Sequence, residues 1–454
     1  MSLFNNAIIG ASGQQGYKIS RSVRLRSSAS AYLSRTLTTP TNNKIWTWSG
    51  WIKRGKPGGS SASGMHLFGT GSASTDAASN QIQFDGENLL LTGYATNWLK
   101  SNAVFRDPSA WYHIVVAWDN SNATVANRAK IYVNGIEISY SIDNRASLST
   151  SSTYGINQAV LHTIGAWSWN NGTFAQPEYY DGYLTEVNFI DGQALTPSSF
   201  GETNALTGVW QPKKYAGTYG TNGFYLNFSD NSAATAAAIG KDNSGNGNNW
   251  TPNNISVTAG VTYDSMTDVP TLTSATAANY CVVNPLDNAL GASITNGNLQ
   301  VTSSGASWKT VRSTFALTTG SWYVELTSTT GTGNGNSFIG IVPMGVTLPQ
   351  PVGEGSATSW GYSSNGNVYN NGSVISATGV TWSAGTTVAM TFDGSTLKFY
   401  NAGNLVATIS SIPANTYAFG GSFYDNNAGA FNFGQRPFTY TPPTGFVALN
   451  TYNL

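Results

Sequence analysis

Two stretches of the chain share one order of apolar, polar and turn positions. In residues 111–138, aromatic and branched side chains occupy every second position from Tyr112 to Trp118, a polar turn follows, and a second alternating run stops at an Asn-Gly pair. A period of two is typical of β-strands, and Asn-Gly accepts the positive φ that tight hairpin turns need. Residues 386–409 repeat this order with an Asp-Gly turn. The pattern predicts two β-sandwich domains of similar design.

The remaining pattern is also that of short strands separated by turns. We expect further strands in the first half at residues 31–36, 45–53, 66–69, 81–85, 88–92, 158–164 and 179–190. The strand at 45–53 carries aromatic residues on both faces, which implies cover on both sides or a neighbouring partner. One helix-like turn is expected where Thr196 precedes Pro197, because proline suits the first helical position. The fold class is therefore all-β.

Changes in composition divide the chain into five segments. Residues 1–20 form a polar arm that orders only against a partner surface, and residues 21–205 form the first sandwich. Residues 206–275 are a structured connector, because its large apolar side chains need burial. Residues 276–436 form the second sandwich, and residues 437–454 are a tail extended along it.

Both repeated stretches carry a family resemblance. The first sandwich resembles laminin-G-like and pentraxin-like members of the concanavalin A-like jelly rolls, through WYHIV at 111–115, WD at 118–119 and KIYVNG at 130–135. The second is similar to SPRY domains, which share that sandwich, through GSWYVE at 320–325, FIGI at 338–341, WGY at 360–362 and TLKFY at 396–400. The resemblance implies two concanavalin A-like antiparallel β-sandwiches.

The pairing of these two sandwiches adds a second resemblance. Together with YLSRT at 32–36, WTWSGW at 46–51 and NFGQRPF at 432–438, it is similar to receptor-binding, fibre or appendage proteins of tailed bacteriophages. This implies a virion protein that attaches to other virion proteins through the arm and recognises a host-surface glycan.

Composition is consistent with such a protein. Only 9% of residues are charged, against about a quarter in typical globular proteins, so amide and hydroxyl side chains must keep the surface soluble. The 21 basic and 21 acidic residues balance, which leaves no electrostatic footprint for nucleic acid. Cys281 is the single cysteine, so no intrachain disulfide framework is possible. No stretch has the roughly 20 apolar residues of a spanning helix, and we expect neither membrane insertion nor a signal peptide.

The carboxylates do not suit catalysis. Glycoside hydrolases need two carboxyl groups flanking the scissile bond, which an alternating strand supplies two or four positions apart. Glu186 and Glu325 each stand alone in their strands, and Asp181 lies an odd number of residues from Glu186. The three histidines show no metal-ligand spacing. We expect a protein that is not an enzyme.

One loop has chemistry that suits a hard cation. Residues 242–248 read DNSGNGN, with Asp242 and Asn246 as oxygen donors that calcium could use. The loop has a single carboxylate, and Asn-Gly pairs are also the ordinary chemistry of turns. A plain turn without a cofactor is the favoured interpretation.

Sugar binding fits the aromatic and amide side chains best, because flat rings stack on pyranoses while amides and carboxylates bond their hydroxyls. The candidates in the first sandwich are Trp167, Trp169, Asn171, Tyr180 and Asp181. Those in the second are Trp360, Tyr362, Asn365, Tyr369 and Asn370, on a stretch expected to project as a loop. The alternative is that Trp167 and Trp360 are core aromatics.

The sequence thus favours a phage fibre, spike or capsid appendage with lectin-like domains. An extracellular carbohydrate-binding module is the alternative, followed by a polysaccharide-cleaving enzyme. The scarcity of charge and the two-sided strand at 45–53 also favour a homo-oligomer, with a trimer preferred.

Overall fold

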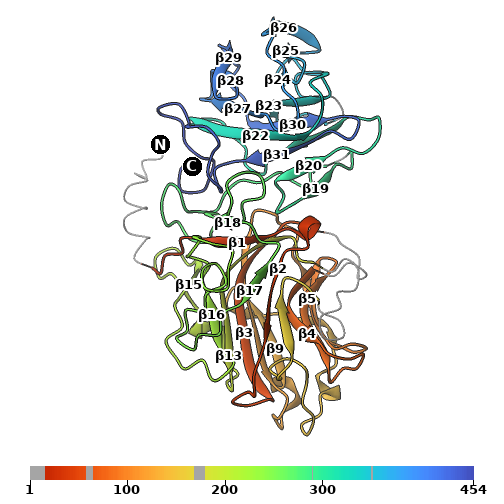
Figure 1. The fold of residues 1–454 in the computed structure, drawn as a ribbon, viewed down its shortest axis with the longest axis vertical. Coiled ribbons are helices and arrows are strands. Elements are labelled where there is room, and N and C mark those ends of the chain that lie inside the picture. The colour runs from red at the N-terminus through yellow and green to blue at the C-terminus, as the bar shows by residue number, and fades with distance from the viewer. Residues whose placement is uncertain (1–15, 58–64, 168–178, 289, 349–350) are drawn as a thin grey trace. The chain divides into compact units, whose positions relative to one another are not determined.

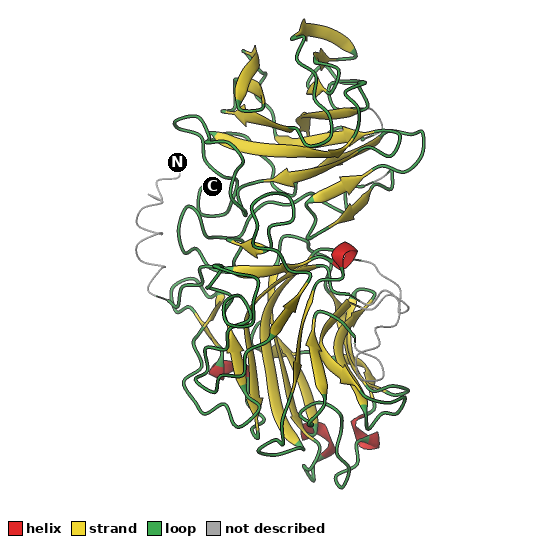
Figure 2. Cartoon of the chain, in the orientation of Figure 1, coloured by secondary structure: helices red, strands yellow, loops and turns green. Residues whose placement is uncertain are grey.

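The computed structural model describes residues 16–57, 65–167, 179–288, 290–348 and 351–454. Strands make up 42% of the chain and helical turns 3%, which confirms the all-β class (Figure 2). Two compact units are present, Met1–Thr258 with Tyr263–Thr273, and Ala259–Thr262 with Ser274–Leu454. No helix within the described ranges is long and apolar enough to cross a membrane.

The first unit is a sandwich of two antiparallel sheets (Figure 1). One sheet has the order β10 (Ile136–Glu137), β9 (Ala129–Val133), β8 (Trp111–Asp119), β3 (Ile45–Arg54), β13 (Gly182–Asp191), β1 (Ser22–Leu25) and β18 (Ser265–Met266), with β16 (Phe224–Leu226) paired to β13. The other has the order β11 (Tyr140–Asp143), β7 (Asn97–Val104), β6 (Asn88–Thr92), β5 (Ser79–Asp85), β4 (Met65–Gly71), β12 (Leu161–Ile164), β2 (Tyr32–Thr36) and β17 (Thr251–Asn253). The predicted hairpin at 111–138 is β8, β9 and β10.

Short elements complete this unit. The strands β14 (Gly201–Thr203) and β15 (Trp210–Pro212) form a separate ribbon. The helical turns are η1 (Ser27–Ala29), η3 (Val125–Asn127), η4 (Arg145–Ser147) and η5 (Pro197–Ser199). The last confirms the turn expected after Thr196, although the Thr196 side chain makes no capping hydrogen bond.

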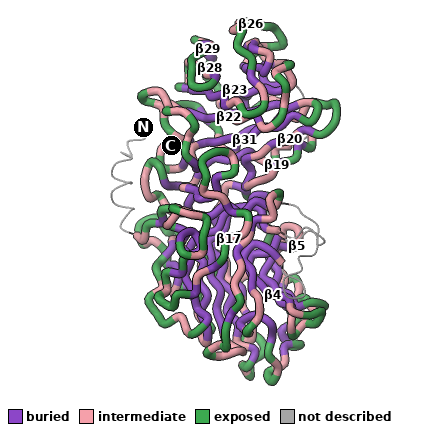
Figure 3. The backbone as a smooth tube through the Cα atoms, in the orientation of Figure 1, coloured by how far each residue is buried: buried purple, intermediate pink, exposed green. Residues whose placement is uncertain are grey.

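Aromatic side chains fill the space between the two sheets. Trp46 and Trp118 stack at 5.5 Å between ring centroids, and Phe68 packs near Trp250, which is fully buried. The purple interior of Figure 3 follows this core along the strands. Alternation in each strand supplies one inward face per sheet, so the core lies between the sheets.

The outer face of β3 is covered by the chain itself. Trp51 is only 4% exposed and stacks on His113, which in turn lies against Trp210 of β15. The aromatic residues on both faces of β3 therefore need no second copy of the chain to be buried. This removes one of the two reasons for expecting a homo-oligomer, which stays a prediction.

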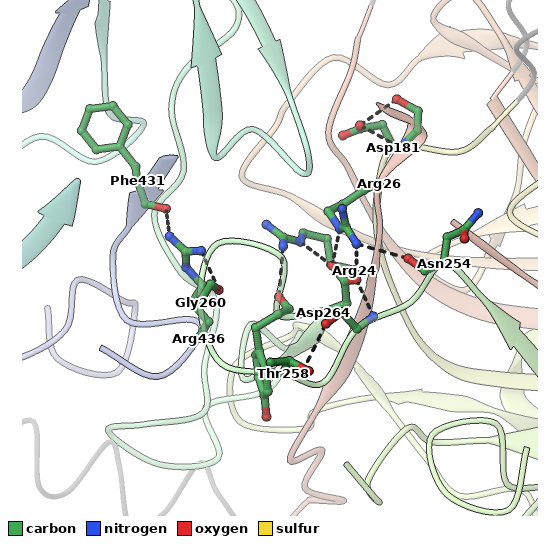
Figure 4. A network of polar contacts seen from close by, with 12 residues as sticks. Arg24, Arg26, Asp181, Asn254, Thr258, Gly260, Asp264, Phe431 and Arg436 are labelled. Atoms are coloured by element: carbon green, nitrogen blue, oxygen red, sulfur yellow. Dashed lines mark hydrogen bonds and ion pairs between the residues drawn. The ribbon is translucent and has the colours of Figure 1, made fainter. Parts of the chain in front are cut away.

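The segment expected as a connector, residues 206–275, contributes strands to the first unit. β16, β17 and β18 all pair within its sheets. A buried carboxylate fixes the end of the segment: Asp264 accepts hydrogen bonds from Arg24 Nε at 3.0 Å and Arg26 Nε at 2.8 Å (Figure 4). The segment is thus structured, while the exact domain boundaries stay a prediction.

The second unit is also a sandwich of two antiparallel sheets. One has the order β19 (Ser293–Thr295), β20 (Gln300–Thr302), β31 (Ala428–Asn432), β22 (Trp322–Thr330), β27 (Thr387–Phe392), β28 (Leu397–Asn401) and β29 (Asn404–Ile409). The other has the order β21 (Lys309–Arg312), β30 (Tyr417–Phe423), β23 (Ser337–Pro343), β24 (Trp360–Ser363), β25 (Asn367–Asn370) and β26 (Ser373–Ala377). The repeated pattern at 386–409 is β27, β28 and β29.

One buried carboxylate ties the C-terminal segment to the second unit. Glu325 of β22 is 1% exposed and accepts hydrogen bonds from the backbone N–H groups of Thr439 and Tyr440, both at 2.9 Å. Val447 then forms a parallel bridge with Trp322. The tail is therefore held by side-chain and backbone contacts on β22.

Candidate functional site

Two of the sugar-binding candidates of the first unit are buried structural residues. Tyr180 and Asp181 are both 0% exposed. The Tyr180 hydroxyl donates to the Lys53 carbonyl at 2.9 Å, and Asp181 Oδ2 accepts from the Ser27 hydroxyl at 2.9 Å. The expectation that they face a ligand is wrong. Both residues directly precede β13, and their side chains bond to Lys53 and Ser27. Trp169 and Asn171 lie outside the described residues.

The candidates of the second unit form a packed hairpin, β24 and β25, instead of a projecting loop. Trp360 and Tyr362 lie in β24 and are 7% and 0% exposed. The Tyr362 hydroxyl donates to the Val380 carbonyl and accepts from Asn401 Nδ2. The expected exposed loop is wrong, because the alternation in this stretch points these rings into the sandwich.

The amides of this hairpin also serve the fold. Asn365 Nδ2 donates to the Tyr369 hydroxyl at 3.2 Å, and the half-buried Tyr369 ring packs on Phe338. Asn370 Nδ2 donates to the carbonyls of Ala357 and Ser359. The five candidates of the second unit are thus brought together, but by packing and turn contacts.

Trp167 leads to a different arrangement. It is half-buried, its Nε1 donates to Ser79 Oγ at 3.3 Å, and its ring stacks on His66. Both residues line a hollow of about 200 Å³ on the outer face of the sheet that contains β4 to β7. The full lining is His66, Gln81, Gln83, Asp85, Leu90, Thr92, Gly93, Tyr94, Asn97 and Trp167.

The register of the sheet gathers this lining. Gln81, Gln83 and Asp85 alternate along β5 on the face opposite to the buried Ile82 and Phe84. Across the sheet, Gln83 pairs with His66 of β4 and with Leu90 of β6, while Gln81 pairs with Thr92, which pairs with Asn97 of β7. Directly paired residues share a face, so four strands contribute side chains to one polar surface.

Several polar atoms at this surface are not used by the fold. Gln83 is 9% exposed, and no hydrogen bond of its amide is found within the described part of the chain. Since Gln83 also lines the hollow, its amide is available for hydrogen bonds to a ligand there. Asn97 also lines the hollow; its Oδ1 accepts from the Thr92 hydroxyl at 2.8 Å, and its amide nitrogen has no partner among the described residues.

The charges around the hollow are few. Asp85 Oδ2 accepts from Lys100 Nζ at 2.7 Å, and both side chains are partly exposed. Asp76 lies behind Gly93 and accepts hydrogen bonds from the Ala95 N–H at 2.7 Å and from the Thr96 hydroxyl at 2.6 Å. Burial alone would raise the pKa of Asp76, but these hydrogen bonds outweigh it and lower the pKa below its ordinary value.

A second hollow, of about 210 Å³, has a different character. Its lining includes Tyr17, Val209, Trp210 and Leu272. Its amides bond each other and their neighbours, as where Asn204 Nδ2 donates to Gln211 Oε1. A smaller hollow of about 90 Å³ lies in the second unit, lined by Thr310 and by residues from Val342 to Ser359. Within the described residues, neither lining contains a side-chain amide without a hydrogen-bond partner, as Gln83 is in the hollow beside Trp167.

In the loop at 242–248, the candidate cation ligand Asp242 already accepts hydrogen bonds from N–H groups of the chain. The carboxylate of Asp242 accepts from the backbone N–H groups of Tyr225, Ser244 and Asn248. Asn246 Nδ2 donates to two backbone carbonyls and so directs a donor inward. Across the described ranges, no three His, Cys, Asp or Glu residues gather as metal ligands. These contacts support the plain turn, while calcium binding at Asp242 and Asn246 stays a hypothesis.

The two carboxylates weighed for catalysis both bond within the fold. Glu186 accepts from the Tyr225 hydroxyl at 2.7 Å and from the Tyr17 hydroxyl at 3.3 Å, and Glu325 holds the tail. Burial raises the pKa of Glu186 to about 7, against the lowering effect of the two tyrosine hydroxyls. Each carboxyl group thus has a structural role in its own unit.

Sequence reasoning found Trp167 but missed the side chains that surround it. Gln83, Tyr94 and Asn97 belong to three different segments, and only the register brings them together. A signal was present at 81–85, where QIQFD places polar side chains at every second position. Such a face is equally typical of an ordinary solvated sheet, so the pattern alone does not mark a site.

Comparison with known proteins supports the fold of the first unit. Residues 26–199 match the family model described as the concanavalin A-like lectin/glucanases superfamily. No curated protein matches the sequence.

Several solved structures match parts of this chain at low identity. The SPRY domain of human HERC1 is 18% identical with a TM-score of 0.28, over 33% of this chain and 94% of that one. A putative carbohydrate binding protein from Bacteroides ovatus is 16% identical with a TM-score of 0.37, over 52% of this chain and 59% of that one. A heptameric SAP-like pentraxin from Limulus polyphemus is 18% identical with a TM-score of 0.27, over 37% of this chain and 71% of that one.

Proposed function

We propose that this protein is a non-catalytic carbohydrate-binding protein whose first unit holds a sugar in the hollow beside Trp167. The observation that carries the proposal is Gln83, whose amide has no partner among the described residues and lines a hollow together with the aromatic ring of Trp167. The family match of residues 26–199 to a superfamily of lectins and glucanases agrees with this assignment.

The chemistry of the hollow suits a sugar. Trp167 and Tyr94 supply flat aromatic surfaces, and Tyr94 is 44% exposed. Gln83 and Asn97 supply amide donors and acceptors for hydroxyl groups. Typical ligand pockets measure roughly 300 to 1,000 Å³, so a hollow of about 200 Å³ would hold one sugar ring of a longer glycan.

A glycan array followed by calorimetry tests this proposal. The full-length protein should bind a subset of glycans, and Gln83→Leu should abolish most of that binding, because leucine fills similar space without hydrogen-bonding groups. Tyr94→Ala should weaken binding by roughly 3- to 10-fold, since an aromatic contact contributes about 0.5–1.5 kcal/mol.

Tyr452→Ala is the matched control, because Tyr452 is 42% exposed and belongs to the second unit. Its binding should equal that of the wild type. If Gln83→Leu binds glycans as well as the wild type while folding normally, the hollow is not the site.

We also propose that the protein works in a virion, as a phage fibre, spike or capsid appendage that recognises host-surface glycan. The resemblance of the paired sandwiches and the low content of charge support this role. The predicted arm, residues 1–20, would attach it to other virion proteins. Tyr17 and Ile19 at its end bond to the first unit, so the proposal assigns attachment to residues 1–15. A secreted lectin-like module is the alternative.

Particle assembly distinguishes the two roles. Deleting residues 1–15 should leave glycan binding intact and abolish incorporation into particles. Incorporation of the truncated chain at the normal level would place attachment elsewhere, with residues 437–454 as the next candidate. Light scattering of the purified protein would test the expected homo-oligomer, for which a trimer is preferred.

A further inference from the structure

Negatively charged groups outnumber positively charged ones at the hollow beside Trp167. Among the described residues, its lining contains one carboxylate, Asp85, and neither lysine nor arginine. The nearby cation, Lys100, is already held by Asp85 Oδ2 at 2.7 Å. A second carboxylate, Asp76, lies behind Gly93 of the rim. With histidine counted as neutral, these groups sum to one negative charge.

The hydrogen-bonding needs of the lining point in the same direction. Asp85 binds Lys100 through Oδ2, and its Oδ1 has no hydrogen-bond partner among the described residues. An ionised carboxylate only accepts hydrogen bonds. A ligand group placed there must therefore donate. A sugar hydroxyl can donate to Asp85 and accept from the Gln83 amide, whereas a ligand carboxylate can only accept.

We infer that the hollow selects uncharged, hydroxyl-bearing sugar residues and rejects acidic ones such as uronic or sialic acids, with Asp85 as the discriminating residue. This rests on the proposed sugar binding. Asp85 repels a ligand carboxylate and also neutralises Lys100, which would otherwise attract one. Like charges brought together at an interface cost several kcal/mol, so the discrimination is electrostatic in origin.

The test compares neutral glycans with otherwise similar glycans that carry a uronic or sialic acid, on full-length protein. The wild-type protein should bind the neutral glycans and show no binding to the acidic glycans. In Asp85→Asn, the side chain gains a donor and Lys100 loses its counter-charge. The ratio of neutral to acidic binding should therefore fall by at least about tenfold.

Two further variants guard against a trivial result. Lys100→Met removes the cation but keeps Asp85, so it should retain neutral binding and its neutral preference. Glu87→Gln makes the same change in net charge as Asp85→Asn, but Glu87 pairs with Arg106 and does not line the hollow. Its glycan preference should equal that of the wild type. Thermal unfolding of each variant reports whether the fold is kept.

The outcomes separate this inference from the proposed function. Wild-type binding to no glycan at all would overturn both. Wild-type preference for acidic glycans, or an unchanged ratio in a folded Asp85→Asn protein, would overturn the inference and leave sugar binding in place. If Asp85→Asn does not fold, the Lys100→Met variant decides. Binding of acidic glycans by Lys100→Met overturns the inference, and an unchanged preference for neutral glycans supports it.

Discussion

Replacing Glu186 by glutamine should change how the stability of the first unit depends on pH. Glu186 lies in β13 where the pairing with β3 shifts register, with a φ of +52° and 5% exposure. Its carboxyl group contacts the hydroxyls of Tyr17 and Tyr225. Burial disfavours the ionised form and raises the pKa from 4.5 to about 7.

The sign and size of the effect follow from proton binding. Between pH 4.5 and 7 the folded state keeps the Glu186 proton while the unfolded state has released it. The contribution of Glu186 to stability is therefore highest below pH 4.5 and falls as the pH rises toward 7. A shift of this size corresponds to about 3 kcal/mol in the free energy of unfolding, at 1.36 kcal/mol for each pH unit.

Glu186→Gln cannot ionise and should lose this dependence. The variant should gain about 3 kcal/mol relative to the wild type between pH 4.5 and pH 8, measured by calorimetry and tryptophan fluorescence. Glu202→Gln is the control, because Glu202 is an exposed carboxylate of the same unit. A stability difference between Glu186→Gln and wild type that stays constant from pH 4 to 8 would refute the reasoning.

Three further substitutions test the buried polar contacts. Glu325→Leu should free the C-terminal segment, because the N–H groups of Thr439 and Tyr440 lose their charged acceptor, and hydrogen bonds to charged groups contribute roughly 1.5–3 kcal/mol each; limited proteolysis should then cleave residues 439–454, and an intact tail would contradict this role. Tyr362→Phe should lower the free energy of unfolding by about 1–2 kcal/mol without altering glycan binding, whereas weaker binding at equal stability would restore this hairpin as a site. Asp264→Ala should cost about 3–5 kcal/mol, since Arg24 and Arg26 lose their shared carboxylate; unfolding in urea measures this, and a loss below 1 kcal/mol would mean that solvent reaches the pair.

Local pattern was enough to predict many of the strands and turns, although not β7 or the hairpin of β24 and β25. The alternation in 111–138 and 386–409 gave the correct hairpins, because side-chain direction in a strand has a period of two and Asn-Gly and Asp-Gly pairs favour tight turns. The all-β class followed from many such short runs. The turn before η5 followed from the preference of proline for a first helical position.

What covers each face was decided only by the tertiary structure. A strand pattern shows that two faces differ, but not which face another segment will bury. The stretch at 360–370 has the composition of an exposed loop, yet Tyr362 is fully buried because the second sheet packs on it. The second aromatic face of β3 is covered by Trp210, which lies far away in sequence.

The candidate site shows the same limit most clearly. Trp167 could be named from its residue type, but Gln83, Tyr94 and Asn97 are ordinary polar or aromatic residues in separate segments. They become one surface because the register of β4 to β7 aligns them. The sequence by itself determined the strands, since these depend on neighbouring residues; the site depends on hydrogen-bonded pairing between distant strands, which only the folded sheet decides.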